Sequence, residues 1–180
     1  KQTAPSLRED GIVKEVEEEE TQDEKQSREA LEALENEINQ KRKALEGDEL
    51  ANHIQTRMTP DGLLVELIDD NEKPLFELGS ARPSALLGQL LEVVAPVLAT
   101  AENRMEIFGH TDALAYQSDG TYSNWELSTD RANIARRLLG AHGLPSEQIS
   151  AVVGKASTEP LLPDPFAPQN RRIAVLLRSP

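Results

Sequence analysis

The chain has 180 residues, a formal net charge of −13 at pH 7 and no cysteine. This acidic balance excludes nucleic acid as a partner, and also adhesion to an anionic membrane through a basic patch, because both rest on clustered Lys and Arg. The absence of cysteine excludes disulfide cross-links and thiol catalysis, and the length suits one domain with a tail.

The N-terminal part of the chain is predicted to be an acidic linker followed by an amphipathic helix. Residues 1–26 carry many acidic and few apolar side chains, which favours a solvated linker. From Ser27 to Leu45 the composition turns helical. The apolar seam of this helix is Leu31, Leu34, Ile38 and Leu45. Lys41 interrupts the seam, which is too short for a coiled coil, so we expect a helix that either docks on the domain or pairs across a dimer.

We place the domain boundary after Gly47, with residues 1–47 as linker and helix and residues 48–180 as the main domain. The chain begins at Lys1 without a methionine or a signal peptide. No apolar run approaches the ~20 residues that a membrane helix needs. We therefore interpret the chain as an excised fragment of a longer protein.

The main domain is predicted to alternate strands with helices. In chain order we expect a short helix at Leu50–Met58, a strand at Gly62–Ile68, a long helix opened by Pro83, a strand at Arg104–Phe108, a long helix at Asn124–Ala141 closed by Gly143, and strands at Ile149–Val153 and Arg172–Leu177. This alternation predicts an α/β fold, a two-layer sandwich. We expect a mixed sheet of about four strands with the two long helices covering one face.

Arg131 stands out because it falls on the face of the second long helix that should be buried. It shares the 3.6-residue stripe with Leu127, Ile134 and Leu138. Burying a guanidinium is costly unless an anion meets it, and Asp112, at the end of an apolar strand, is the first candidate partner. Alternatively, Arg131 meets a ligand carboxylate and Asp112 is left to meet a ligand ammonium.

Several separate blocks of sequence resemble the OmpA-like peptidoglycan-binding domains. They are Thr111-Asp112, then Asn124, Leu127-Ser128 and Arg131-Ala132, and finally Asn170-Arg171-Arg172. Two further blocks, Pro74–Ala81 and Tyr122–Ser128, resemble more narrowly the MotB family, the B subunits of the flagellar stator. The resemblance covers Gly62 to Leu177. The chain has a long loop, Ala113–Ser123, where the general family has a short one, and such a loop is typical of MotB-like members.

The resemblance implies an OmpA-like fold that binds peptidoglycan without catalysis or a cofactor. Peptidoglycan of Gram-negative type carries meso-diaminopimelate, whose free end is an α-amino acid zwitterion. Asp112 would meet the ammonium, and the forked guanidinium of Arg131 would meet the carboxylate. The family pattern adds Thr111, Asn124 and Leu127 as the flanking wall, and Arg171 from the C-terminal block. Asn124 begins the helix that bears Arg131, so free backbone N–H groups there would also favour an anion.

The same resemblance implies a homodimer in the periplasm, which anchors a flagellar motor stator to the cell wall. The full protein would have an N-terminal helix in the bacterial inner membrane, outside this chain, and would assemble with MotA-type stator subunits through it. The tail up to about Leu45 would regulate anchoring. One alternative is a general OmpA- or Pal-like cell-wall tether, although the block that contains Trp125 favours the MotB family. The other is a peptidoglycan hydrolase.

Three other patterns suggest catalysis or metal binding and are better explained by structure. His110 lies near Asp112, but no second histidine stands at ligand spacing, so we expect a hydrogen-bonded structural histidine. No G-x-S-x-G motif surrounds Ser80. Glu126 and Asp130 could imitate a glycosidase acid pair, yet acids near a helix start are favoured by the helix dipole.

Overall fold

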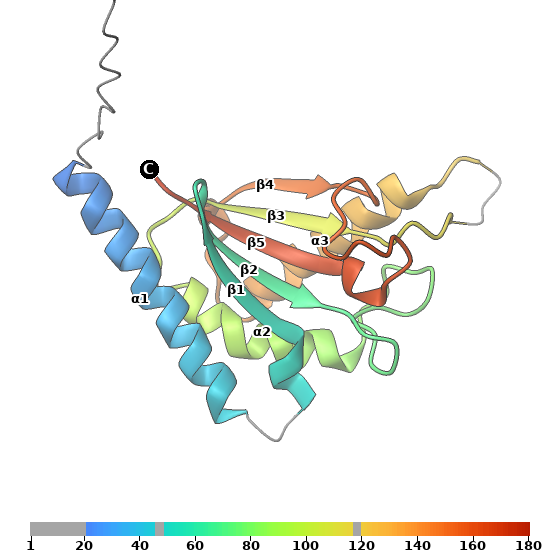
Figure 1. The fold of residues 1–180 in the computed structure, drawn as a ribbon, viewed down its shortest axis with the longest axis horizontal. Coiled ribbons are helices and arrows are strands. Elements are labelled where there is room, and N and C mark those ends of the chain that lie inside the picture. The colour runs from blue at the N-terminus through green and yellow to red at the C-terminus, as the bar shows by residue number, and fades with distance from the viewer. Residues whose placement is uncertain (1–20, 46–48, 117–119) are drawn as a thin grey trace, which may run out of the picture.

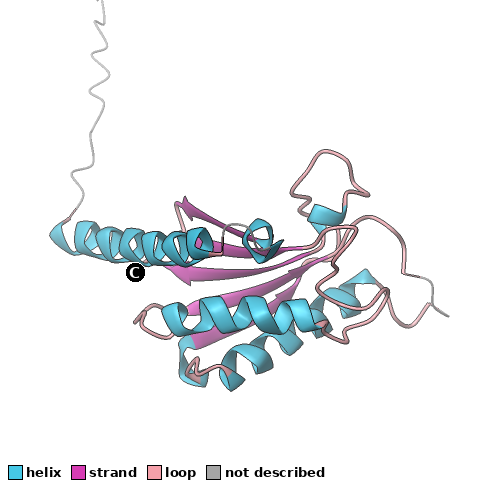
Figure 2. Ribbon diagram, turned by 90° about the horizontal axis from the view of Figure 1, so that it is seen from below, coloured by secondary structure: helices cyan, strands magenta, loops and turns pink. Residues whose placement is uncertain are grey.

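The computed structural model describes residues 21–45, 49–116 and 120–180, which form a five-stranded mixed sheet with helices packed on it (Figure 1). The elements are α1 (Gln22–Ala44), the 3-10 helix η1 (Glu49–His53), β1 (Ile54–Thr59), β2 (Gly62–Ile68), α2 (Ala85–Leu98), β3 (Met105–His110), α3 (Asn124–Ala141), η2 (Ser146–Gln148), β4 (Ile149–Gly154), η3 (Pro168–Asn170) and β5 (Arg172–Arg178). Helices α2 and α3 cover one face of the sheet, which confirms the two-layer α/β sandwich (Figure 2). None of the described helices is long and apolar enough to cross a bilayer.

The last strand of the chain lies in the middle of the sheet. The strand order is β1-β2-β5-β3-β4, so β5 enters between β2 and β3 and pairs antiparallel with both. At one end of β5, Arg172 pairs with Ile68 of β2 and with His110 of β3. The loops that follow β2 and β3 therefore meet the loop that precedes β5 at one end of the sheet, which Figure 1 shows at the right.

The predicted helix at Leu50–Met58 is wrong. A short 3-10 helix ends at His53, and Ile54–Thr59 is a strand that pairs with β2 along its whole length. Leu50, Ile54 and Met58 recur every fourth residue, which imitates a helix. However, the pairing with β2 makes the segment a strand, because strand formation depends on tertiary context more than on local preference. The sheet therefore has five strands, one more than expected.

The N-terminal helix begins earlier than its composition indicated. Helix α1 starts at Gln22, and Thr21 and Glu24 form a capping box, in which the Thr21 side chain accepts from the Glu24 N–H and Glu24 accepts from the Thr21 N–H. This box was readable in the sequence as T-x-x-E. Residues 1–20, the rest of the expected linker, lie outside the described residues.

Helix α1 docks on the domain, which was one of the two uses expected of it. It lies along the β1 edge of the sheet (Figure 1), and Leu31 and Ile38 have no exposed area and belong to the core. The Asn39 side-chain amide donates to the Thr56 hydroxyl over 3.2 Å, and Arg42 donates to the Ile54 carbonyl over 3.2 Å. The helix thus covers an edge strand that would otherwise present unpaired backbone groups.

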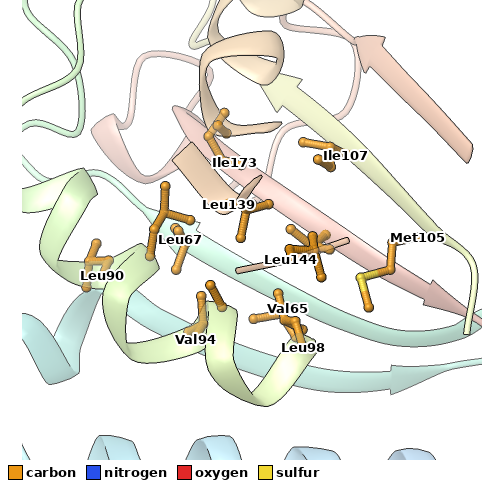
Figure 3. Close-up of a cluster of buried hydrophobic side chains, with 14 of the residues drawn as sticks. Val65, Leu67, Leu90, Val94, Leu98, Met105, Ile107, Leu139, Leu144 and Ile173 are labelled. Atoms are coloured by element: carbon orange, nitrogen blue, oxygen red, sulfur yellow. The ribbon is translucent and has the colours of Figure 1, made fainter. Parts of the chain in front are cut away.

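The remaining strands and long helices agree with the sequence. Strand β2 and helix α3 have the predicted bounds. Helix α2 begins at Ala85 and is capped by the hydroxyl of Ser84, so Pro83 lies just before the helix and does not open it. The core lies between the sheet and these helices (Figure 3), and its members include Leu63, Val65, Leu67, Leu90, Leu91, Val94, Leu98, Met105, Ile107, Leu139, Ile173 and Val175. Burying each large side chain contributes about 1.5–3 kcal/mol.

Helix α3 packs against two strands at glycines. A Cβ on Gly109 of β3 would overlap the backbone carbonyl of Ser128, and a Cβ on Gly154 of β4 would overlap the side chain of Thr129. Ser128 itself is fully buried. This close approach fixes the first turns of α3 on the sheet and so sets where Arg131, one turn further on, projects.

We expect Gly109→Ala to lower the free energy of unfolding by about 3 kcal/mol, because the added methyl must displace a helix backbone instead of a mobile side chain. Urea unfolding followed by circular dichroism measures the change. Gly140→Ala in α3 is the control, since a Cβ there meets nothing within 4 Å, and it should be neutral or stabilise by up to about 1 kcal/mol. Equal stabilities of the two variants would contradict the close packing.

Candidate functional site

Arg131 is buried, as its position on the helix indicated, with 6% of its surface exposed. Its Nε donates to the Ser80 carbonyl over 2.9 Å and its Nη2 donates to the Glu77 carbonyl over 3.3 Å. Its guanidinium carbon lies 5.0 Å from the centre of the Phe76 ring, a cation–π distance. All three partners come from the segment between β2 and α2, and they hold the arginine with neutral groups.

The direct ion pair between Asp112 and Arg131, one of the two arrangements that the sequence left open, is wrong. In the part of the chain that the structure describes, Arg131 forms no ion pair, and Asp112 pairs with Arg171 instead, over 2.8 Å. The physical reason is the insertion of β5 beside β3, which places the residue just before β5 next to the loop that follows β3. Arg171, which the family pattern placed in the C-terminal block, is thus the residue that pairs with Asp112.

Asp69 completes the site, and neither the helix periodicity nor the family pattern predicted it. Its carboxylate accepts from Nε of Arg171 over 2.9 Å and from the Leu75 N–H over 3.1 Å. Its own N–H donates to the Arg171 carbonyl over 3.0 Å. Asp69 is 5% exposed, and this burial raises the pKa of its carboxyl in spite of the opposing effect of Arg171.

The site therefore holds two acids and two arginines: Asp69, Asp112, Arg131 and Arg171. Burial lowers the pKa of Arg131, and the charges of Asp69 and Asp112 oppose that effect. For Arg171 burial also acts to lower the pKa, but its bonds to the same two carboxylates outweigh it and raise the pKa. A cavity of about 10 Å³, room for roughly one water molecule, lies among Asp69, Phe76, His110, Arg131 and Arg171.

Two of the other expected site residues, Thr111 and Asn124, hold the loop of Asp112 in place. The Thr111 N–H donates to the Ala156 carbonyl over 2.8 Å, and its hydroxyl donates to the Asp112 carbonyl over 2.9 Å. The Asn124 amide donates to the Leu114 carbonyl over 2.9 Å. Leu127 is buried one turn before Arg131. Thr111 and Asn124 are therefore brought to the Asp112 loop, as supports of its backbone.

The first turn of α3 is capped within the protein. The side chain of Ser123 accepts from the Trp125 N–H over 3.2 Å, and Glu126 accepts from the Ser123 N–H over 2.7 Å. Bonds from Ser123 lower the pKa of the Glu126 carboxyl, the opposite of what a general acid needs. Asp130 accepts a 2.6 Å hydrogen bond from the Tyr122 hydroxyl. These contacts give both acids structural partners.

Exposed large apolar side chains gather on the loops around the site. Among the described residues they are Leu78, Leu114, Trp125, Leu162 and Phe166. Leu78 follows β2, Leu114 follows β3, Trp125 opens α3, and the last two belong to the loop before β5. Apolar side chains gathered at one end of a molecule mark an interaction surface more often than scattered ones do.

His110 is buried, and among the described residues no group forms a hydrogen bond with its Nδ1 atom, so the expected hydrogen bond is not found there. Burial, followed by the charge of Arg172, lowers the pKa of His110 to about 4. In residues 21–45, 49–116 and 120–180 there is no group of three His, Cys, Asp or Glu side chains that could hold a metal ion. His110 is a neutral core histidine near neutral pH.

We expect acidification from pH 7 to pH 5 to destabilise the protein by about 2 kcal/mol through His110, because the unfolded chain takes up a proton near pH 6.5 and the folded one resists it until about pH 4. The stability is thus complete above pH 6.5 and is lost as the pH falls. Urea unfolding at both pH values should show a smaller loss for His110→Gln than for the parent. His142→Gln, at the C-terminal end of α3, is the control and should keep the parent's loss; an unchanged loss in His110→Gln would contradict the assignment.

Comparisons with known proteins show the family of this chain and agree with its fold. Residues 75–173 match the OmpA family. Motility protein B of Escherichia coli K12 is 41% identical over 130 residues, which cover 71% of this chain and 42% of that protein. The chain thus spans less than half the length of this relative.

Two solved structures share the fold. The cell wall anchor of the T6SS from Pseudomonas aeruginosa superimposes with a TM-score of 0.62 at 25% identity, covering 76% of this chain and 94% of that one. The periplasmic domain of MotB from Helicobacter pylori gives a TM-score of 0.60 at 20% identity, covering 70% of this chain and 79% of that one. The second likeness concerns the fold alone.

Proposed function

Because this chain belongs to the OmpA family, we propose that it anchors a larger assembly to the cell wall by binding peptidoglycan without catalysis. The observation that carries the proposal is Arg131, a buried guanidinium with no carboxylate of its own among the described residues. A buried cation without an acidic partner is costly, and a ligand carboxylate would supply the missing charge. Asp112, fixed by Arg171 nearby, is suited to an ammonium.

The ligand that matches these two charges is the free zwitterionic end of diaminopimelate in a peptidoglycan stem peptide. Two of the five N–H donors of Arg131 are used by the Ser80 and Glu77 carbonyls. The remaining donors would bind the ligand carboxylate, and charge-assisted bonds of this kind are stronger than neutral ones. Thr111, Asn124 and Leu127 would keep the Asp112 loop and α3 at the right separation.

The assembly that fits best is a flagellar motor stator. The similarity to Motility protein B of E. coli supports this role, as does the block Tyr122–Ser128. We propose that the chain is the periplasmic part of a homodimer. The rest of the protein would hold an inner-membrane helix and contact a MotA-type subunit. Residues 1–47 would link that helix to the binding domain, which comprises residues 48–180. Light scattering of the intact chain measures its mass in solution and so tests the dimer.

A general OmpA- or Pal-like tether is the alternative within this fold. The similarity to the cell wall anchor of the T6SS from P. aeruginosa supports cell-wall attachment as part of an assembly other than a stator. A peptidoglycan hydrolase is the alternative of another class, and the carboxylates argue against it. The pKa of Glu126 is lowered, and Asp69, whose pKa is raised by burial, is held by Arg171 and cannot serve as a free acid.

We expect Arg131→Ala and Asp112→Asn each to weaken retention on purified sacculi by at least about tenfold, because each removes one charge from the zwitterion site. Co-sedimentation with sacculi measures binding, and analysis of the supernatant for released muropeptides tests hydrolysis in the same sample. No release is expected from any variant.

Arg137→Ala is the matched control, since Arg137 is exposed on the same helix and should bind as the parent does. Removing one side of a buried charged group can itself destabilise the fold, so the melting temperature of each variant is measured in parallel. Folded Arg131→Ala that sediments with sacculi like the parent would refute the zwitterion site, and release of muropeptides by the parent would favour the hydrolase.

A further inference from the structure

We propose that Asp69 is a positioning residue that determines specificity, because it holds Arg171 in a position that leaves Asp112 open to an ammonium group. The inference deepens the proposed function and rests on it. Asp69 would not touch the ligand itself. It would act through Arg171, by deciding how much of the Asp112 carboxylate that arginine occupies.

The geometry of Arg171 carries this inference. Its Nε donates to Asp69 over 2.9 Å and its Nη1 donates to Asp112 over 2.8 Å, so one guanidinium is shared between two carboxylates. A guanidinium that meets a single carboxylate prefers the bidentate arrangement, in which two parallel N–H groups occupy both oxygens. The shared arrangement keeps the contact with Asp112 to one oxygen, Oδ2.

Asp112 consequently has capacity for a further donor. Among the described residues, its Oδ1 accepts only the Leu114 N–H, over 3.0 Å, and its Oδ2 accepts only Nη1 of Arg171. A carboxylate offers about four acceptor positions, so about two remain. The Asp112 side chain is 11% exposed, more than twice the exposure of the Asp69 side chain at 5%. Asp112 is therefore the more exposed of the two acids and the one with acceptor positions left for a ligand.

Asp69 is fixed by contacts on both sides. Its N–H donates to the Arg171 carbonyl over 3.0 Å, and its Oδ1 accepts from the Leu75 N–H over 3.1 Å. It directly follows β2, whose last residue, Ile68, pairs with Arg172 of β5. The carboxylate is thus held beside the start of β5 by backbone contacts, and it cannot swing away from the arginine without breaking them.

The charge balance of the site points the same way. Two carboxylates and two guanidiniums sum to zero, and a zwitterionic ligand adds no net charge. Without the charge of Asp69 the site would carry one excess positive charge, and Arg171 would be free to take both oxygens of Asp112. Such a site would bind a plain carboxylate and would lose its preference for a ligand that also carries an ammonium.

The test compares two competitors of sacculus binding that have the same carbon chain. Meso-diaminopimelate has the ammonium groups and heptanedioate lacks them. For the parent, diaminopimelate should compete at a much lower concentration than heptanedioate does. The measured quantity is the inhibitory concentration of heptanedioate divided by that of diaminopimelate. In Asp69→Asn this ratio should fall by about tenfold, chiefly because diaminopimelate competes more weakly.

Asp61→Asn is the control for the loss of one acidic charge, because Asp61 is 71% exposed and contacts Arg178, away from the site. It should keep the parent's ratio. The double variant Asp69→Asn with Arg171→Lys gives a second check. A lysine ammonium is a point charge that cannot take both carboxylate oxygens in the forked geometry, so the ratio should recover towards that of the parent.

The outcomes distinguish a failure of the proposed zwitterion site from a failure of the role given to Asp69. A parent that diaminopimelate does not displace from sacculi overturns the proposed zwitterion site. A parent that discriminates, together with a folded Asp69→Asn that keeps the ratio or weakens both competitors equally, overturns the inference and leaves Asp69 with a structural role only. Should Asp69→Asn fail to fold, Asp69→Ser, which is smaller and uncharged, provides the same comparison.

Discussion

The bridge that Arg171 makes between Asp69 and Asp112 joins three segments that are far apart in the chain. Asp69 follows β2, Asp112 follows β3, and Arg171 precedes β5, which lies between those two strands. Because β5 pairs with both neighbours, the three loops must end together, and the charges there must balance in a confined space. The position of Arg131 depends on the same end of the sheet, since its backbone partners belong to the segment after Asp69.

The sequence predicted best those features that depend on one helix or strand alone. The stripe that places Arg131 on the buried face of a helix depends only on the period of that helix, and its burial was predicted correctly. The partner of Asp112 was not predictable in that way, because Arg171 lies 59 residues further along the chain and arrives through strand pairing. Asp69, 102 residues from Arg171, was hidden among neighbouring acids that suit a turn.

Strand β1 shows the same limit for the fold. Its residues fit both a helical and an alternating pattern over a short window, and pairing with β2 determines the result. Family resemblance predicted Asp112, Arg131, Thr111, Asn124, Leu127 and Arg171 as site residues. It did not predict that Thr111 and Asn124 donate hydrogen bonds to the backbone of the Asp112 loop, because those contacts depend on how the loop folds.

The placement of α1 has a mechanical consequence. The start of α1 lies at one end of the molecule, and the loop of Asp112 and the first turns of α3, which carry Arg131, lie at the other, with the strands running between them (Figure 1). Tension applied between Gln22 and a ligand held at Arg131 would therefore act along the strands. Hydrogen bonds between antiparallel strands lie perpendicular to that direction, so they would be loaded in shear and would share the force instead of opening one after another.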